Sequence, residues 1–372
     1  MLHNAFKESQ VFLHAKDLTT TAETAENLLE VVNESIDVAQ KLYNTKVYCI
    51  VSDNASNMKK MGQLSGLWYS NCNSHTANLL AKDISNTPEI ALCLAQAHSV
   101  LKEFKHPELE RRVTENKGYR MKLPCDTRWC SNLDASSCLV SNFPIMRQVV
   151  VASSNDLKIK QDVKKLLFDD DFETQCQDCI DLLNPICELI NTAHSAECTL
   201  ADVVDLWLNL KTNHVYNKEH YREIIQRRVE SALNIYALTA YYLDINKDFK
   251  KLQDDMQEKV YNFLLEELHK NGIEEWVQFR ESMEIFKSLK EKGITNWQSF
   301  WKTAKLKCPK LSELAMKLLK IPASSVQIER LFSNWSYVHS SVRNRLTFDR
   351  SKKLLYVYYS LKLTDNNKSE EY

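Results

Sequence analysis

An aspartate stands where a short apolar segment of the chain ends. Residues 47–51 read Val-Tyr-Cys-Ile-Val, and Ser52, Asp53 and Asn54 follow them directly. An unbroken apolar run of this length is typical of a strand that is buried on both faces of a parallel sheet. Open α/β folds assemble their sites at the carboxyl edge of such sheets, so Asp53 is a candidate catalytic carboxylate. The alternative is that its side chain caps a helix that starts near Ala55.

Glu329 is a second candidate carboxylate, far along the sequence from the first. The segment 324–327 reads Ser-Ser-Val-Gln, which is typical of the capping box at the start of a helix. We expect this helix to continue to about Trp335. Asp53 and Glu329 belong to different elements, so their sequence separation does not predict whether they meet.

Several cysteines have spacings that raise the question of a zinc site. Cys-x-x-Cys is a usual ligand pair, and His194 lies near such a pair. The spacing of these cysteines is largely helical, however, and the segment lacks the turn residues of a zinc knuckle, which favours cysteines packed in a core. The cysteines concerned are Cys176, Cys179, Cys187 and Cys198.

Cys72 and His75 form a Cys-x-x-His pair directly after another short apolar segment. Cys125 and Cys130 lie farther along the chain and are candidates to complete a set of four zinc ligands. We favour a structural or non-metal role for these residues.

A polar segment in the first half of the chain carries a cluster of basic side chains. Residues 108–126 predict a basic loop on a solvated face, with nucleic-acid contact as the alternative. The dipeptide Arg128-Trp129 follows this segment. An exposed Arg-Trp pair can hold a phosphate and stack on a base, whereas a tryptophan that anchors a helix in the core is the more common case.

The secondary structure expected around these residues differs between the two ends of the chain and its middle. Residues 1–90 alternate short apolar segments with helical patterns, which predicts a mixed sheet with helices against it. Residues 88–301 show long helical periodicity, which predicts a helical bundle or insertion. Near the C-terminus, residues 354–361 read LLYVYYSL, a stripe that requires burial in the core or against a partner chain.

Composition narrows the class of protein. The chain has 372 residues, of which 44% are hydrophobic and 26% charged, as in a globular protein of two domains or of one domain with a large insertion. Five glycines and seven prolines predict a mostly helical fold, and the lack of Gly-rich loops excludes Walker and Rossmann nucleotide sites. A net charge of −1 argues against an overall basic surface for nucleic acid, although 48 Lys and Arg allow local patches.

Targeting signals are not evident. The N-terminal residues lack the apolar core of a signal peptide, and no run of eighteen apolar residues occurs, so we expect no membrane association. We expect a nuclear location, with the cytoplasm as the alternative. The eleven cysteines are then expected to be reduced thiols.

Four motifs, in this order along the chain, together resemble the hAT superfamily of DNA transposases and the proteins derived from them. Residues 51–58, VSDNASNM, resemble the family's second catalytic aspartate motif, and residues 72–75, CNSH, resemble its Cys-x-x-His motif. Residues 126–129, DTRW, resemble its Arg-Trp motif. Residues 322–333, PASSVQIERLFS, resemble its catalytic glutamate and dimerisation segment.

The resemblance implies an α/β fold with a large all-α part. An RNase H-like mixed sheet flanked by helices would be interrupted by an α-helical insertion domain, and the chain would be predominantly helical overall. The resemblance also implies that Asp53 and Glu329 are the second and third catalytic, metal-binding carboxylates. His75 and Arg128 would contact DNA near the cleavage site, and Trp129 would stack on a flipped base.

The sequence departs from the family's pattern at its start. An active hAT member has an earlier aspartate on its first strand, usually within an Asp-x-Trp-Thr type motif, but no aspartate precedes Asp17 here. We therefore expect an N-terminal truncation that removes the first strand, and the N-terminal zinc finger is missing too. Two-metal chemistry needs carboxylates that hold both ions, so we expect weak or lost Mg²⁺ binding at Asp53 and Glu329, and no cofactor unless an upstream aspartate completes the site.

The expected function is therefore association. We expect a transposon-derived, catalytically inactive protein that dimerises with itself or with a related hAT-family protein, with residual DNA binding as a further property. The alternative is a fragment of an active hAT transposase that cleaves and transfers DNA strands, with its first aspartate encoded upstream. The residues expected to carry dimerisation are Leu331, Phe332, Leu354, Leu355 and Tyr358.

The expected domain boundaries follow from the same resemblance. Residues 1–135 would form a partial RNase H-like core without its first strand, and residues 136–300 the α-helical insertion domain. Residues 301–363 would form the dimerisation segment and complete the core. Residues 364–372 would be a disordered tail.

Overall fold

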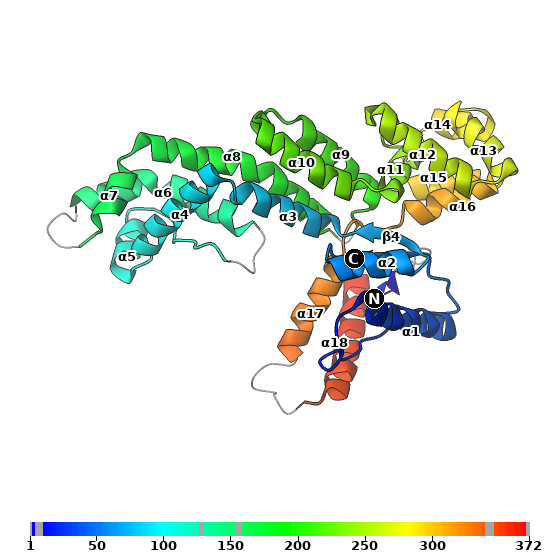
Figure 1. Cartoon of the computed structure of the whole chain (residues 1–372), viewed down its shortest axis with the longest axis horizontal. Coiled ribbons are helices and arrows are strands. Elements are labelled where there is room, and N and C mark those ends of the chain that lie inside the picture. Colours follow the sequence, from blue (N-terminus) through cyan, green and yellow to red (C-terminus); the bar gives the residue numbers. More distant parts are fainter. Residues whose placement is uncertain are drawn as a thin grey trace. The chain divides into compact units, whose positions relative to one another are not determined.

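The protein is predominantly helical, as the sequence predicted (Figure 1). The computed structural model describes residues 2–3, 10–125, 130–152, 158–195, 197–338 and 346–369. These residues divide into two compact units. The first unit comprises residues 1–73, 193–205 and 231–372, and the second comprises residues 74–192 and 206–230. These divisions differ from the boundaries expected at residues 135 and 300, and the assignment of those domains stays a prediction.

The strands of the described residues lie in the first unit and form two small sheets. β1 (Leu2–His3) pairs antiparallel with β2 (Gln10–Val11). β3 (Cys49–Ser52) pairs in parallel with β4 (Trp68–Asn71). The apolar run that ends before Asp53 therefore is a strand, whereas the larger RNase H-like sheet stays a prediction.

Two helices pack beside these strands in the first unit. α1 (Ala25–Tyr43) begins at Thr24, whose side chain accepts a hydrogen bond from the Asn27 backbone N–H, and it packs against α2 (Ser56–Leu64). Gly62 of α2 lies so close to β4 that a Cβ atom there would stand 2.2 Å from the Tyr69 ring. Glycine is required at this position because the helix and the ring approach so closely.

A second group of helices in the first unit surrounds an aromatic core. Trp301 and Phe279 have ring centroids 5.1 Å apart, and Phe286 packs 5.2 Å from Phe279. The Trp301 indole N–H donates to the Leu243 carbonyl at 3.2 Å, so its polar atom is satisfied in the core. The elements of this group are α11 (Ile235–Leu243), the 3₁₀ helix η2 (Phe249–Lys251), α12 (Asp254–Glu267), α13 (Lys270–Arg280), α14 (Glu284–Glu291), α15 (Trp297–Ala304) and α16 (Pro309–Leu318).

The last two helices of the first unit pack against each other and against residues near the N-terminus. α17 (Val326–Val338) and α18 (Phe348–Ser369) lie side by side (Figure 1). Their shared core is small and consists of Phe12, Leu331, Leu355 and Tyr359. α18 continues to Ser369, into the segment 364–372 for which disorder was predicted.

The second unit consists of helices, and its buried cysteines confirm the core placement predicted for Cys176, Cys179 and Cys187. Cys198, in the first unit, is buried as well. The elements of the second unit are α3 (Asn73–Ser85, from residue 74), α4 (Pro88–Phe104), α5 (Pro107–Glu115), α6 (Ser131–Ala152), α7 (Gln161–Leu167), α8 (Asp170–Ala193, to residue 192), α9 (Leu200–Thr212, from residue 206), the 3₁₀ helix η1 (His214–Tyr216) and α10 (Glu219–Ala232, to residue 230).

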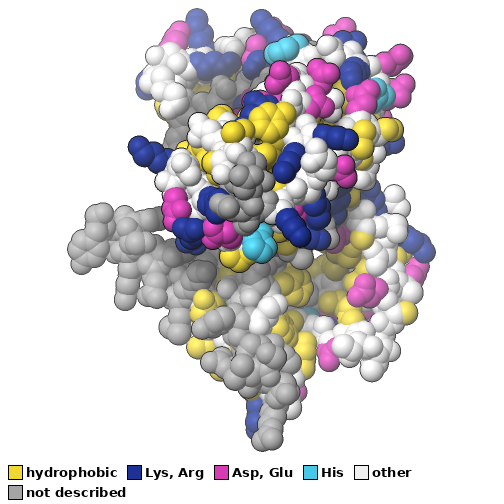
Figure 2. Space-filling model, turned by 90° about the vertical axis from the view of Figure 1, so that its left-hand side faces the viewer, with side chains coloured by type: hydrophobic (Ala, Val, Ile, Leu, Met, Phe, Trp, Pro, Cys, Tyr) yellow, Lys and Arg dark blue, Asp and Glu magenta, His cyan; other side chains and the backbone are white. Residues whose placement is uncertain are grey.

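The prediction of a basic loop over residues 108–126 is wrong for its first half, which is the helix α5. Arg111 pairs with Glu108 at 2.8 Å and with Glu115, and Arg112 pairs with Glu108 at 3.0 Å. These pairs have the i,i+3 and i,i+4 spacing that stabilises helices. Figure 2 likewise shows Lys and Arg side chains interspersed with Asp and Glu on the face that it draws. The arginines of this segment are thus partly neutralised by their own helix.

Candidate functional site

Asp53 lies directly after β3, at the carboxyl end of the β3–β4 pair, and its side chain is exposed. One carboxylate oxygen, Oδ1, accepts a hydrogen bond from the Ala55 backbone N–H at 3.0 Å. The Tyr69 hydroxyl lies 2.8 Å from Ser52 Oγ and donates to the Asp53 backbone carbonyl at 3.2 Å. The backbone at Asp53 is therefore fixed by β4. One carboxylate oxygen of Asp53 is therefore used by the turn before α2. This is similar to the alternative in which the Asp53 side chain caps a helix, although the cap residue of α2 is Ala55.

The segment that leads into α17 is attached to the end of β4. The Asn73 backbone and side-chain N–H groups both donate to the Ala323 carbonyl, at 3.0 and 3.1 Å. The Ser325 backbone N–H donates to the sulfur of Cys72 at 3.3 Å, and this thiol is completely buried. Cys72 therefore acts as a structural acceptor that holds the start of α17 beside the strand that follows Asp53 in the chain. This hydrogen bond gives Cys72 a structural role, which is one of the roles that the sequence favoured for it.

The other side of the same segment is attached to residues 193–200 of the first unit. The Ser324 hydroxyl donates to the Ala193 carbonyl at 2.6 Å, and the Ala323 N–H donates to the Cys198 carbonyl at 2.9 Å. Farther along, the Arg330 guanidinium donates to the His194 carbonyl at 3.1 Å. Backbone groups on two sides thus determine where the first turn of α17 lies.

Glu329 lies in this first turn, and its side chain is half-buried. Burial raises the pKa of the Glu329 carboxyl, and the negative charge of Asp53 raises it further. The fold thus places the charge of Asp53 where it acts on the carboxyl of Glu329. Their roles as catalytic and metal-binding residues stay predictions.

The donor set around these carboxylates does not fit the metal site that the resemblance implied. Within the described part of the chain, no group of three or more His, Cys, Asp or Glu side chains is placed to hold a metal ion. Asp53 and Glu329 alone offer two like charges without a third ligand from the described residues. We therefore derive no step through a metal ion.

The predicted DNA contacts are placed only in part. His75 lies in the first turn of α3 and is half-buried. Arg128 and Trp129 lie outside the described residues, so their contacts with DNA stay predictions.

The five residues expected to carry dimerisation separate into two sets. Leu331 and Leu355 are buried inside the chain, at the small core between α17 and α18. Phe332, Leu354 and Tyr358 are exposed. A dimer contact in this region can therefore use the exposed residues Phe332, Leu354 and Tyr358 directly. The buried residues Leu331 and Leu355 instead hold the two helices in position.

The separation follows the geometry of α18. Ser351, Leu355 and Tyr359 are spaced four residues apart and are all buried, so they form the face that packs inside the chain. Leu354 and Val357, on another face, expose 46% and 54% of their surface. The stripe that the sequence showed as one apolar segment therefore covers two faces of a helix.

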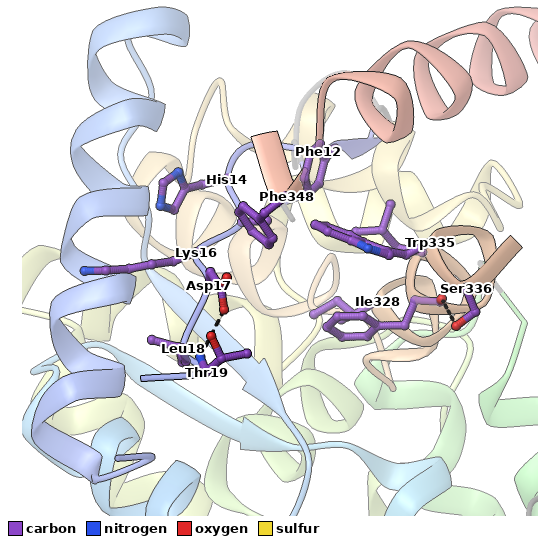
Figure 3. Close-up of a pocket in the computed structure, with 13 residues that line it drawn as sticks. Phe12, His14, Lys16, Asp17, Leu18, Thr19, Ile328, Trp335, Ser336 and Phe348 are labelled. Atoms are coloured by element: carbon purple, nitrogen blue, oxygen red, sulfur yellow. Dashed lines mark hydrogen bonds between the residues drawn. The ribbon is translucent and has the colours of Figure 1, made fainter. Parts of the chain in front are cut away.

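An open groove lies beside this helix pair, within the first unit (Figure 3). Its volume is about 810 Å³. Residues 12–19 form one wall, with Lys16 and Asp17 along it, and Trp335 of α17 lies on the other wall. Phe348, the first residue of α18, packs against Trp335 with ring centroids 5.2 Å apart. The residues of the two walls are remote in sequence, so no local pattern predicted the groove.

Comparison with protein-family models identifies a match in the C-terminal part of the chain. Residues 274–361 match the hAT family C-terminal dimerisation region. The chain carries an hAT dimerisation region. This match supports an hAT-family, transposase-derived protein with a capacity to dimerise. No curated protein matches the chain.

The hAT dimerisation region begins within α13 and includes most of α18, so it contains α17, the exposed face of α18 and one wall of the groove. Glu329 lies inside the hAT dimerisation region, whereas Asp53 lies outside it. In the part of the chain that the structure describes, no helix is long and apolar enough to cross a membrane.

Proposed function

We propose that this hAT-family chain functions by associating with a second copy, or with a related hAT-family chain, through the exposed apolar side chains of α17 and α18. The observation that carries the proposal is the coincidence of the matched dimerisation region with these side chains. We further propose that the chain does not cleave DNA. The described carboxylates Asp53 and Glu329 lack a third metal-binding partner among the described residues, which supports this part of the proposal.

The physical driving force is the removal of apolar surface from water. Phe332 exposes 60% of its surface on α17, and Leu354, Val357 and Tyr358 form a patch on α18. Burial of apolar surface contributes roughly 25 cal/mol per Å², so a contiguous patch of this kind favours association.

The test is the oligomeric state in solution, measured by size-exclusion chromatography with light scattering. We expect the wild-type chain to dimerise, and the double variant Leu354→Asp, Tyr358→Asp to be monomeric, because two carboxylates would be desolvated at the contact. Both positions are exposed, so the substitutions do not disrupt the core. Leu355 is unsuitable for this test because it is completely buried.

The matched control is Leu306→Asp. Leu306 also lies within the hAT dimerisation region, but between α15 and α16, and it is 83% exposed. We expect this variant to dimerise like the wild type. A wild-type monomer across the concentration range, or a dimer that survives both substitutions in α18, would refute the proposed function.

A second candidate function is DNA strand cleavage by a chain that obtains a further carboxylate from elsewhere. The feature in its favour is that the charge of Asp53 raises the pKa of Glu329. An assay with hairpin DNA and Mn²⁺ distinguishes the candidates. Cleavage by the wild type that Glu329→Gln abolishes would support the enzyme, and equal, background cleavage by both would exclude it for this chain.

A further inference from the structure

Apolar side chains from three segments of the chain converge in the groove between residues 12–19 and α17. Phe12, Ile328, Leu331, Trp335 and Phe348 all line it. Its volume of about 810 Å³ lies within the range of roughly 300–1,000 Å³ that is typical of pockets that enclose an apolar ligand or anchor. We propose that this groove receives the exposed face of α18 from a second copy of the chain. The inference rests on the proposed function and names the surface that the partner occupies.

The spacing on α18 suits an occupant of such a groove. Leu354, Val357 and Tyr358 stand at positions i, i+3 and i+4, which is the spacing of anchor residues when an amphipathic helix lies in an apolar groove. All three are exposed in the single chain. Leu355 and Tyr359 of α18 pack in the core of the chain. The face of α18 that carries Leu354, Val357 and Tyr358 is therefore the one available to a partner.

A second copy is the favoured occupant because of where the groove lies. Its α17 wall and Phe348 belong to the matched dimerisation region. Phe332, which is exposed and was expected to carry dimerisation, also lines the groove. One wall of the groove and the α18 face therefore belong to the same dimerisation region, and both leave apolar side chains such as Phe332 and Leu354 exposed.

The charges on the groove wall are compatible with α18. Lys16 is engaged by Glu34, with 2.7 Å between Lys16 Nζ and Glu34 Oε1. The Thr19 backbone N–H donates to Asp17 Oδ1 at 3.0 Å and lowers the pKa of that carboxyl, so Asp17 stays ionised. The exposed Lys353 precedes Leu354 on α18 and supplies the opposite charge. Complementary charges of this kind favour the correct register of two surfaces.

Symmetry makes the contact reciprocal. In a twofold dimer each copy offers one groove and one α18 face, so two equivalent contacts form. A homodimer of a variant with a blocked groove loses both contacts. A homodimer of a variant with a charged α18 face also loses both contacts. A mixed dimer of the two variants, in contrast, retains one intact groove that faces one intact α18.

The groove is blocked by Thr19→Arg on one wall and by Ser336→Arg on the other, since both residues line it and are exposed. The α18 face is changed by Val357→Asp. The matched control is Thr20→Arg, which places the same charge one residue away, at an exposed position that is not among the groove residues. Circular dichroism and thermal melting of each variant check that the chain remains folded.

Dimer dissociation constants are measured by analytical ultracentrifugation. We expect Thr19→Arg, Ser336→Arg and Val357→Asp each to raise the dissociation constant by roughly 100-fold or more, because a charge is desolvated in an apolar contact. Thr20→Arg should differ from the wild type by less than about threefold, the scale of an ordinary surface substitution.

Mixing experiments by native mass spectrometry, with one variant isotopically labelled, give the decisive result. Thr19→Arg mixed with Val357→Asp should form a heterodimer, whereas Thr19→Arg mixed with Ser336→Arg should not. If the wild type dimerises and both groove variants dimerise equally well, the groove contact is wrong. The same holds if the first mixture forms no heterodimer. Either result would leave the proposed function intact. A wild-type monomer would overturn both.

Discussion

The hAT dimerisation region contains two parts that are built very differently. In α13–α16, the aromatic side chains of Phe279, Phe286 and Trp301 are buried and pack against one another. In α17–α18, the buried core is small, and large apolar side chains remain exposed. The first part therefore has the larger packed core, whereas the second part keeps more of its apolar surface exposed. Under the proposed function, this exposed surface of the second part is the one that meets a partner.

The aromatic part should be the more sensitive of the two to loss of a side chain. We expect Trp301→Ala to lower the free energy of unfolding by about 3–5 kcal/mol, because a completely buried indole leaves a cavity and the Leu243 carbonyl loses its donor. Chemical denaturation followed by circular dichroism measures the change. Leu306→Ala, at an exposed position, should change stability by less than about 0.5 kcal/mol. Similar values for the two variants would contradict the comparison.

The α17–α18 part should respond locally to the loss of a buried side chain. Leu355→Ala should cost about 2 kcal/mol, the lower end for a buried leucine, since a small core can relax around the cavity. Hydrogen–deuterium exchange should then accelerate in α18 while α13–α16 remains protected. The control is Lys353→Ala, at an exposed position on the same helix. Equal acceleration throughout α13–α18 would show that the two parts unfold together.

The smallest expected effect is a change in the pKa of Glu329, which lies in the first turn of α17. Burial and the charge of Asp53 raise the pKa of Glu329, so the folded chain holds a proton at pH values where the unfolded chain has lost it. This contribution to stability is complete below the ordinary pKa of glutamate and is lost as the pH rises through the raised pKa. Asp53→Asn should lower the pKa of Glu329, although burial will still keep it above its ordinary value.

Carbon-detected NMR titration of the Glu329 side-chain carboxyl measures this shift. Asp37→Asn, at an exposed position on α1, is the control and should leave the titration of Glu329 unchanged. If Asp53→Asn also leaves it unchanged, the two carboxylates are not in electrostatic contact, and the remaining argument for a catalytic pair is lost.

Much of the local structure was predictable because it depends on neighbouring residues. The apolar run before Asp53 indicated β3, and the pattern after Ser325 indicated α17 with Glu329 in its first turn. α5 was missed because its basic residues suggested a loop, although Pro107 at its start and the i,i+4 pair of Glu108 and Arg112 were helix signals in the sequence.

The arrangement of distant segments was not predictable from local patterns. The position of Glu329 relative to Asp53 depends on Cys72 and Asn73, which hold the start of α17 through hydrogen bonds to residues about 250 positions later. The separation of the α18 stripe was partly predictable, since a spacing of four residues relates Leu355 to Tyr359. Which face packs inside the chain, however, depends on Phe12, from a remote segment.

The participation of Phe12 in the core with Leu355 and Tyr359 has a consequence for synthesis on the ribosome. Residues 74–192 and 206–230 form a unit that can fold while later segments are still being translated. Phe12 must wait until α18 has left the exit tunnel, because its core partners Leu331, Leu355 and Tyr359 follow it far along the chain. Contacts of such long sequence separation form slowly, so we expect α17 and α18 to join Phe12 late in folding.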